Sequence, residues 1–201
     1  MQQRSEETRS HILQSALTLF SRNGYDATSV AEICQAAGVS KGAFYHHFSS
    51  KQTVFQSLLE GWLSSLNLQM EALLNNAPDV PAGFMRMASM ASPVFRDAQG
   101  QFPMFLEFWT QSSRDPALWE TAIAPYRHFL QLFSDALAKG VHQGSISPVD
   151  PKLTAQALMA LAMGVVLQQV LDPQETAGDG VAELGMRLLF EGLRPSQEKN
   201  K

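Results

Sequence analysis

Cysteine and charged residues are both scarce in this chain of 201 residues. The only cysteine, Cys34, has no partner within the chain, which excludes an intrachain disulfide and favours a reducing cytoplasm. Charged residues make up 17% of the sequence and hydrophobic residues 45%, whereas typical soluble domains contain about 25% charged residues. A chain with so little charge is expected to cover surface beyond its own core, in a subunit interface or around an apolar cavity.

The sequence predicts no leader peptide and no membrane span. The N-terminal segment MQQRSEETRS is polar and charged, unlike a secretory signal. Residues 153–171 carry no charge, but they include four polar side chains, and their continuous apolar stretch is too short to cross hydrocarbon. We therefore expect no membrane partner and a cytoplasmic location.

Strand-like alternation of apolar and polar residues is absent too, and apolar side chains recur instead at helical spacing. The expected fold is therefore all-α. Residues 75–83, NNAPDVPAG, predict a breaker-rich linker. Besides two short helices described next, helices are expected over residues 6–23, 50–75, 84–97, 102–113, 116–143, 153–171 and 180–193.

The segment TSVAEICQAAGVSKGAFYHHFSSK predicts two short helices joined by a tight turn. Ser29 and Ser40 are suited to cap the two helices through their hydroxyl groups, and Gly38 ends the first one where a positive φ is needed. Phe44 and Phe48, four residues apart, form the buried face of the second helix. Its other side chains then point outward: Lys41, Gly42, Ala43, Tyr45, His46 and His47. A short helix with this outer face fits the major groove of DNA.

Residues 8–55, about a quarter of the chain, resemble the start of TetR-family transcriptional regulators. The specific part of the match is AAGVSKG followed by the aromatic-rich FYHHF and by SSK. This resemblance implies that Tyr45, His47 and Lys51 hold phosphates, with Ser29 assisting. It also implies that four residues face base edges: Lys41, Gly42, Ala43 and His46. The residues that we assign to DNA binding are Ser29, Ser40, Lys41, Gly42, Ala43, Tyr45, His46, His47 and Lys51.

Few phosphate contacts are expected for each subunit. The net charge of the chain is −4, which predicts modest non-specific affinity for DNA. Ala31 stands where the family often has a basic residue, so one contact from the first short helix is missing. Lys41 is the outward side chain with a strong base pairing, to guanine O6 and N7, and Ala43 suits a thymine methyl group.

The expected architecture is an N-terminal three-helix helix-turn-helix DNA-binding domain, residues 1–51, followed by a helical ligand-binding and dimerisation domain, residues 52–201. The helix over residues 50–75 connects them. Large soft side chains gather in the second domain, and the chain has nine methionines, which suit adaptable surfaces. They form either ordinary core or a cavity for an apolar or aromatic small molecule. The lining that we predict is Trp62, Met87, Met90, Phe105, Glu107, Phe108, Trp109, Tyr126 and Phe129. Glu107 either points to solvent or meets a polar group of the ligand.

The charge-free helix over residues 153–171 is apolar all round, which indicates burial on several sides. One side is expected to face its own subunit and the other a second copy of the chain; the alternative is a helix buried within one subunit. In the last helix we expect Val181, Leu184, Leu188 and Leu189 to point inward. The family resemblance also implies a four-helix interface between two copies. The residues that we assign to it are Leu158, Leu161, Val165, Gly185, Leu188, Leu189 and Gly192.

These observations predict a cytoplasmic homodimeric repressor that binds a palindromic operator in double-stranded DNA and responds to a small hydrophobic or aromatic effector. No cofactor, metal or catalysis is expected. His46 and His47 point about 100° apart on a helix, so they do not chelate one ion. The alternatives are a helical-bundle enzyme, for which the sequence offers no nucleophile–base pair, and a DNA-binding architectural protein without an effector.

Overall fold

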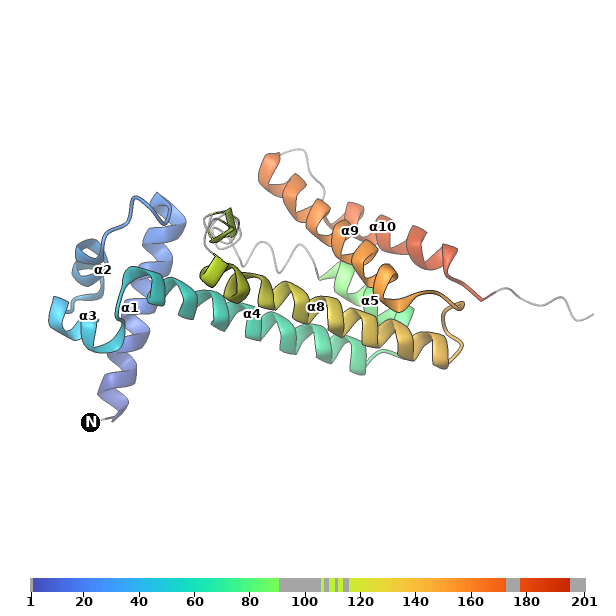
Figure 1. The fold of residues 1–201 in the computed structure, drawn as a ribbon, viewed down its shortest axis with the longest axis horizontal. Helices are drawn as coiled ribbons and strands as arrows, with labels where there is room; N and C mark the ends of the chain where they lie inside the picture. The colour runs from blue at the N-terminus through green and yellow to red at the C-terminus, as the bar shows by residue number, and fades with distance from the viewer. Residues whose placement is uncertain are drawn as a thin grey trace, which may run out of the picture. The chain divides into compact units, whose positions relative to one another are not determined.

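A computed structural model describes residues 2–90, 106, 109–110, 112–113, 116–172 and 178–195. The described part of the chain contains helices and no strands, which confirms the predicted all-α class. The helices are α1 (Gln2–Asn23), α2 (Val30–Ala37), α3 (Lys41–His47), α4 (Lys51–Asn75), α5 (Val80–Ser89), α8 (Pro116–His142), α9 (Pro151–Leu171) and α10 (Gly178–Gly192) (Figure 1). None of these described helices is long and apolar enough to cross a membrane.

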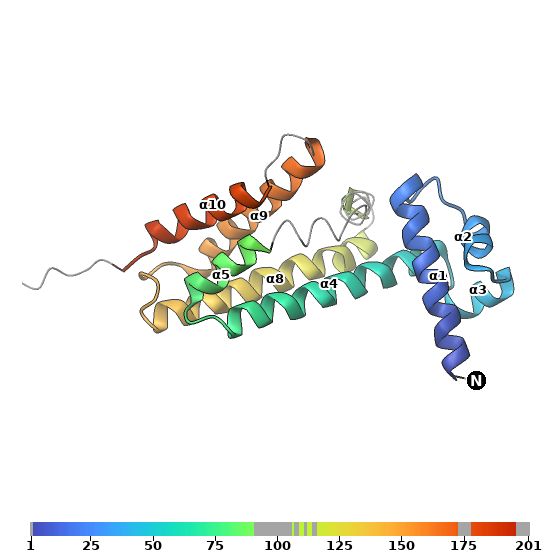
Figure 2. The same cartoon turned by 180° about the vertical axis from the view of Figure 1, so that it is seen from behind.

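The chain divides into two compact units, which Figure 2 shows from the opposite side. The first unit comprises Met1–Ser65 and Ala98–Ala122, and the second comprises Leu66–Asp97 and Ile123–Lys201. Both α4 and α8 contribute residues to each unit. The first unit is larger than the predicted reading domain, because the first half of α4 packs with the three N-terminal helices.

The first unit is built around the buried face of α1. Ile12, Ala16 and Phe20 are spaced four residues apart along one side of α1, and all three are buried. They pack with buried residues of the other elements: Ile33, Cys34, Phe44, Phe48, Val54, Phe55, Leu59 and Ala122. Cys34 lies in this core, where it acts as a small apolar side chain, as the sequence predicted.

The second unit has its own core, formed by α5, α9, α10 and the later part of α8. The ring of Phe84 lies 5.2 Å from that of Phe133 and 5.4 Å from that of Phe190, so one residue of α5 joins α8 to α10. Gly185 lets α10 approach α9 closely, because a Cβ atom at this position would stand 2.8 Å from a methyl carbon of Leu161. The close approach expected at Gly185 is therefore present, but within one chain.

The start of α5 differs from the prediction, because part of the expected linker is helical. Asp79 caps this helix by accepting a hydrogen bond from the Ala82 N–H (2.8 Å), and Pro81 occupies the first turn, where its missing N–H costs nothing. The end of the helix predicted over 84–97 and most of the one predicted over 102–113 lie outside the described residues.

The orientation predicted for α10 is wrong at three of four positions. Val181, Leu184 and Leu188 are exposed, and only Leu189 packs against the core. The inward side chains are instead Ala182, Met186 and Phe190. Both sides of α10 carry apolar residues at helical spacing, so the spacing alone does not tell which side is buried.

Candidate nucleic-acid interface

Ser29 and Glu32 fix the start of α2 through a reciprocal capping box. The Glu32 N–H donates to Ser29 Oγ (3.2 Å), and the Ser29 N–H and hydroxyl both donate to Glu32 Oε2 (2.7 Å each). These bonds, first that of the hydroxyl and then that of the backbone N–H, stabilise the carboxylate and lower the pKa of Glu32 below 4.5. The predicted cap at Ser29 is confirmed.

The turn between α2 and α3 also has the predicted geometry. Gly38 adopts φ 65° and ψ 32°, a left-handed conformation that favours glycine. The Val39 N–H donates to the Cys34 carbonyl oxygen (3.0 Å), which closes the last turn of α2. Ser40 then caps α3 by accepting a hydrogen bond from the Ala43 N–H (3.1 Å). This turn orients α3 against the first unit.

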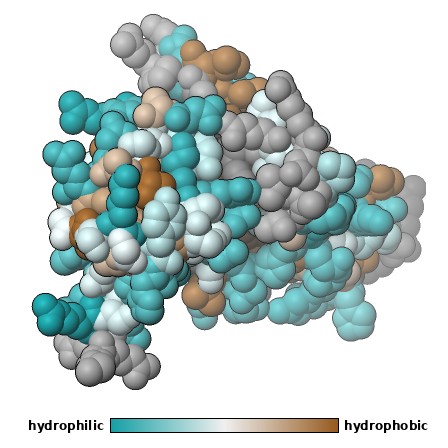
Figure 3. All heavy atoms as spheres, turned by 60° about the vertical axis from the view of Figure 1, so that its left-hand side comes forward, coloured by the Kyte–Doolittle hydropathy of each residue, from teal (hydrophilic) through white to brown (hydrophobic). Residues whose placement is uncertain are grey.

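Two phenylalanines hold α3 so that its other face points to solvent. Phe44 is 0% exposed and Phe48, which follows the helix, is buried as well. Tyr45, on the other side, is 55% exposed, and its ring packs edge-on against Phe44. Lys41, Gly42 and His46 are exposed, whereas Ala43 and His47 are half-buried. Figure 3 brings the first unit forward and shows mostly hydrophilic side chains on this side of it.

The outward face of α3 combines a free cation with room for close approach. Within the described part of the chain, the Lys41 ammonium group has no hydrogen-bonding or ionic partner. A Cβ atom at Gly42 would meet only Ser40 Oγ, at 3.7 Å, so the fold itself does not need glycine there. The rings of His46 and His47 lie 5.1 Å apart, edge to face. Such a face has the cation, aromatic groups and flat surface that DNA contacts use.

Lys51 and Ser29 are already engaged within the protein. The Lys51 ammonium group donates to the carbonyl oxygens of Tyr25 (2.7 Å) and Thr28 (2.8 Å), which leaves it poorly placed for the phosphate contact that the resemblance implied. The hydroxyl of Ser29 serves the capping box, while the residue itself stays exposed. Nothing in the sequence alone signalled the contacts of Lys51, because the carbonyls come from residues 23 and 26 positions earlier.

The residues predicted to line a ligand cavity fall into both units. Trp62 and Trp109 pack against the first core, and the Trp109 indole N–H donates to the Ala122 carbonyl oxygen (2.9 Å). Four others belong to the second unit, where Phe129 is buried, Met87 and Tyr126 are half-buried and Met90 is exposed. Phe105, Glu107 and Phe108 lie outside the described residues. Neither unit by itself contains the whole predicted set.

A polar chain in the second unit was missed by the sequence reasoning, which treated His128 as isolated. His128 Nε2 and Asn67 Oδ1 are 2.8 Å apart, and the Asn67 side-chain amide donates to Glu71 Oε1 (2.9 Å). This chain joins α8 to the second-unit part of α4. Asn67 and Glu71 stand four residues apart on α4, a spacing that places them on one face, but the sequence gave no sign that His128 meets them.

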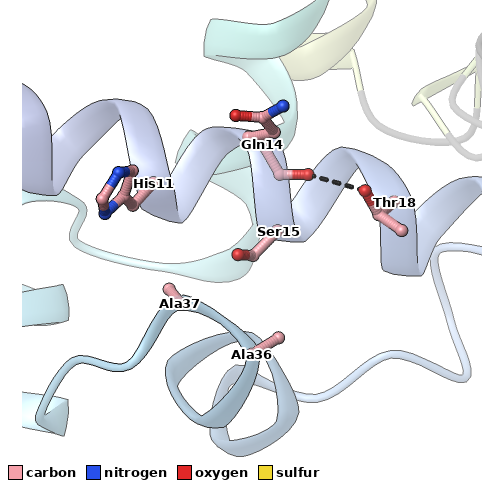
Figure 4. Close-up of a pocket in the computed structure, with 6 residues that line it drawn as sticks. All are labelled: His11, Gln14, Ser15, Thr18, Ala36 and Ala37. Atoms are coloured by element: carbon pink, nitrogen blue, oxygen red, sulfur yellow. Dashed lines mark hydrogen bonds between the residues drawn. The ribbon is translucent and has the colours of Figure 1, made fainter.

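A small polar pocket lies between α1 and α2 in the first unit (Figure 4). Its volume is about 240 Å³, and its lining is His11, Gln14, Ser15, Thr18, Ala36 and Ala37. The Thr18 hydroxyl donates to the Gln14 carbonyl oxygen (3.0 Å), so one of the polar groups at its wall is already paired. With four polar side chains and only two methyl groups, this pocket does not suit the hydrophobic effector that the sequence predicted.

The predicted subunit interface needs correction at two residues. Leu158 is 1% exposed and Val165 is also buried, both in the core of their own unit, so neither offers surface to a second copy. Leu161 and Leu189 pack mainly on that core, and Gly185 lies against Leu161. Gly192 and Leu188 are exposed, as an interface requires. The large exposed apolar residues of these two helices are Leu153, Met163, Leu167, Leu171, Val181, Leu184 and Leu188.

Comparison with known proteins matches both parts of the chain to regulators. The chain is 25% identical over 196 residues to the transcriptional regulator UidR of Escherichia coli strain K12, and the match covers 96% of each chain. It is 26% identical over 192 residues to the transcriptional repressor DhaR of Mycobacterium sp. strain GP1, with 94% of each covered. A Saccharomonospora viridis structure described as a regulator in complex with choline has a TM-score of 0.79 at 22% identity, covering 92% of this chain and 96% of that one.

Two family profiles extend the match along the chain. Residues 12–58 match the profile of bacterial regulatory proteins of the tetR family, a range that contains α2, α3 and the turn between them. Residues 85–193 match the C-terminal profile of BetI-type transcriptional repressors. Since the second profile alone spans more than half of the sequence and the first spans the outward-facing helix α3, this chain belongs to the TetR family of bacterial transcriptional regulators, which bind DNA and are not enzymes.

Proposed function

We propose that this protein is a homodimeric repressor that binds a palindromic operator and leaves it when a small hydrophobic or aromatic effector binds. The observation that carries the proposal is the outer face of α3, where Lys41 has no partner in the described part of the chain and Tyr45 is exposed beside buried Phe44. In a dimer, two such helices enter successive major grooves about 34–36 Å apart. The protein acts in the cytoplasm, where its operator is found.

The outer residues of α9 and α10 support the homodimer. On α9, the exposed side chains Leu153, Met163, Leu167 and Leu171 follow helical spacing, with exposed Ala157 and Ala160 between them. α10 adds Val181, Leu184 and Leu188. Apolar side chains gathered in this way mark an interaction surface rather than a solvated one. Two copies related by a two-fold axis bury the same set of residues on both subunits in a four-helix interface.

The aromatic residues of the first unit support an effector site. The rings of Trp109 and Trp119 lie 6.4 Å apart, and Trp62 packs on the same core. Ser112 is 1% exposed, and its hydroxyl has no hydrogen-bond partner among the described residues. A buried hydroxyl beside tryptophans suits a ligand with an apolar body and one polar group. The similar S. viridis protein, which was solved with choline, also takes up a small organic molecule.

An operator mobility shift tests the proposal. The double variant Lys41→Ala/Tyr45→Ala removes two exposed side chains of α3, and we expect at least about a 100-fold loss of specific affinity, as for two lost groups of about 1–3 kcal/mol each. Lys139→Ala is the matched control, because Lys139 is exposed in the last turn of α8. Unchanged binding by the double variant would refute the assignment.

The effector part has a separate test. Thermal-shift screening with lipophilic amines, acyl compounds and aromatic acids is expected to find a ligand that stabilises the protein and also releases the operator. A ligand that stabilises the protein but tightens operator binding would reverse the proposed direction of control. Stabilisation acts by mass action, so the shift must grow with ligand concentration. Tryptophan fluorescence reports binding directly, because all three tryptophans belong to the first unit.

A further inference from the structure

Lys51, the first residue of α4, is surrounded by acceptors from the loop between α1 and α2. Its ammonium group donates to the carbonyl oxygens of Tyr25 (2.7 Å), Thr28 (2.8 Å) and Asp26 (3.4 Å). It also lies 4.2 Å from the centre of the Tyr25 ring, within the range of a cation–π contact. A lysine ammonium group has three protons, and the three carbonyl oxygens take all of them.

The loop that supplies these carbonyls is itself built with few free groups. Gly24 ends α1 with φ 83°, and the buried Thr28 hydroxyl donates to the Gly24 carbonyl oxygen (2.9 Å). The Tyr25 ring packs against Phe20 (5.3 Å) and Phe55 (5.2 Å) in the core. Ser29, the residue that caps α2, follows directly. The position of Lys51 on α4 therefore fixes the point at which α2 begins.

We infer that Lys51 is a positioning residue for operator binding: it holds the loop of residues 24–29 against α4 and so sets the placement of α2 and α3. It is not a phosphate ligand, since a phosphate reaches its ammonium group only by displacing the carbonyl oxygens. Lys41, whose ammonium group has no partner in the described part of the chain, is the contrasting cation. The inference rests on the proposed use of α3, and its control of loop order is measurable without DNA.

Salt dependence of operator binding separates the two roles. Each lost phosphate contact lowers the slope of log K against log salt by about 0.9, or about 1.8 for a dimer. Lys51→Met keeps the length of the side chain and removes the charge, and Lys41→Met is the matched control. We expect Lys51→Met to weaken binding about 10-fold or more, as for lost hydrogen bonds of a charged group, with the slope unchanged. Lys41→Met is expected to lower the slope.

Hydrogen exchange of the full-length protein without DNA gives the second readout. The backbone amides of residues 25–29 are expected to exchange about 10-fold faster or more in Lys51→Met, because the loop opens more often, and to be unchanged in Lys41→Met. Lys51→Arg keeps the charge but presents a planar fork instead of a compact ammonium group. If Lys51 positions the loop, arginine does not restore slow exchange even where it supports folding.

Two outcomes overturn the inference. One is a salt slope in Lys51→Met that falls as much as in Lys41→Met, and the other is loop exchange that stays at the wild-type rate in both Lys51 variants. Should Lys51→Met fail to fold, Lys51→Arg decides: full recovery of affinity and slope with normal loop exchange assigns Lys51 to phosphate. If Lys41→Met leaves binding unchanged while the loop opens in Lys51→Met, the proposed use of α3 fails and the loop role of Lys51 stands.

Discussion

α3 and the α9–α10 pair differ in what their outer sides carry. In α3, two phenylalanines point inward and the other side shows a lysine, a tyrosine, two histidines and small residues. In α9 and α10, large apolar residues point both inward and outward: Leu158 and Met186 are buried, whereas Leu167 and Leu188 are exposed. Helical spacing identifies the buried side of a helix only where the opposite side is polar.

The difference also indicates what each surface meets. A polar and aromatic outer side that contains a free cation suits a charged partner such as a DNA groove. An uncharged apolar outer side suits another apolar surface, and here the same residues are present on every copy of the chain. The two surfaces are therefore expected to respond to opposite kinds of substitution, and the following experiments test this from the largest effect to the smallest.

The largest effect is expected from a charge on the outer side of α10. Leu184 and Leu188 are 55% and 61% exposed, so Leu184→Asp/Leu188→Asp leaves the fold of one subunit intact. In the proposed dimer it removes four buried leucines, each contributing about 1.5–3 kcal/mol. Light scattering should show a monomer, and operator affinity should fall at least about 100-fold.

The inner side of the same helix supplies the control. Met186 is buried against the second core, and Met186→Ala should lower the free energy of unfolding by about 2–5 kcal/mol without changing the oligomeric state at low temperature. A dimer that survives both aspartates would mean that the outer apolar residues of α9 and α10 serve another purpose, and the comparison with α3 would lose its meaning.

The second experiment separates the two sides of α3. Phe44→Ala leaves a cavity in the first core and should cost about 3–5 kcal/mol of stability. Tyr45→Ala, at the next position, should change stability by less than about 0.5 kcal/mol and act on operator binding instead. Urea unfolding followed by tryptophan fluorescence reports the first unit, which contains all three tryptophans. Equal losses of stability would contradict the orientation of α3.

Much of the first unit could be predicted because its signals are local. The caps at Ser29 and Ser40 and the positive φ at Gly38 each depend on neighbours within four residues, and all three are present. The contacts of Lys51 could not be predicted, since they join residues more than twenty positions apart. The inward side of α10 was mispredicted because both sides of the helix are apolar.

The third experiment asks whether α3 needs room at its outer side. A methyl group at Gly42 meets nothing closer than 3.7 Å in the free protein, so Gly42→Ala should keep or raise stability, by up to about 1 kcal/mol. Operator affinity should nevertheless fall about 10-fold, as when a close base contact is lost. Gly61→Ala on α4 is the matched control: it also has open space and should leave operator binding unchanged. Equal binding by both variants would show that DNA does not approach at Gly42.

The smallest effect is expected at the cap of α2, from the lowered pKa of Glu32. A carboxyl whose pKa is lower in the folded protein adds stability above the unfolded value, 4.5, and loses it as pH falls through the folded value. Glu32→Gln preserves the capping box but does not titrate. The wild type should therefore be the more stable protein at pH 6, and its advantage should shrink below pH 4.5.

Urea midpoints measured by tryptophan fluorescence between pH 6 and pH 3 follow this difference within the first unit. Ser29→Ala removes the hydroxyl that contributes most to the lowered pKa of Glu32, so the pH dependence should shrink in that variant as well. An advantage that instead grows as pH falls would show that Glu32 is destabilised in its ionised form. The cap would then not be the local device that made the helix-turn-helix predictable while the apolar sides of α9 and α10 were not.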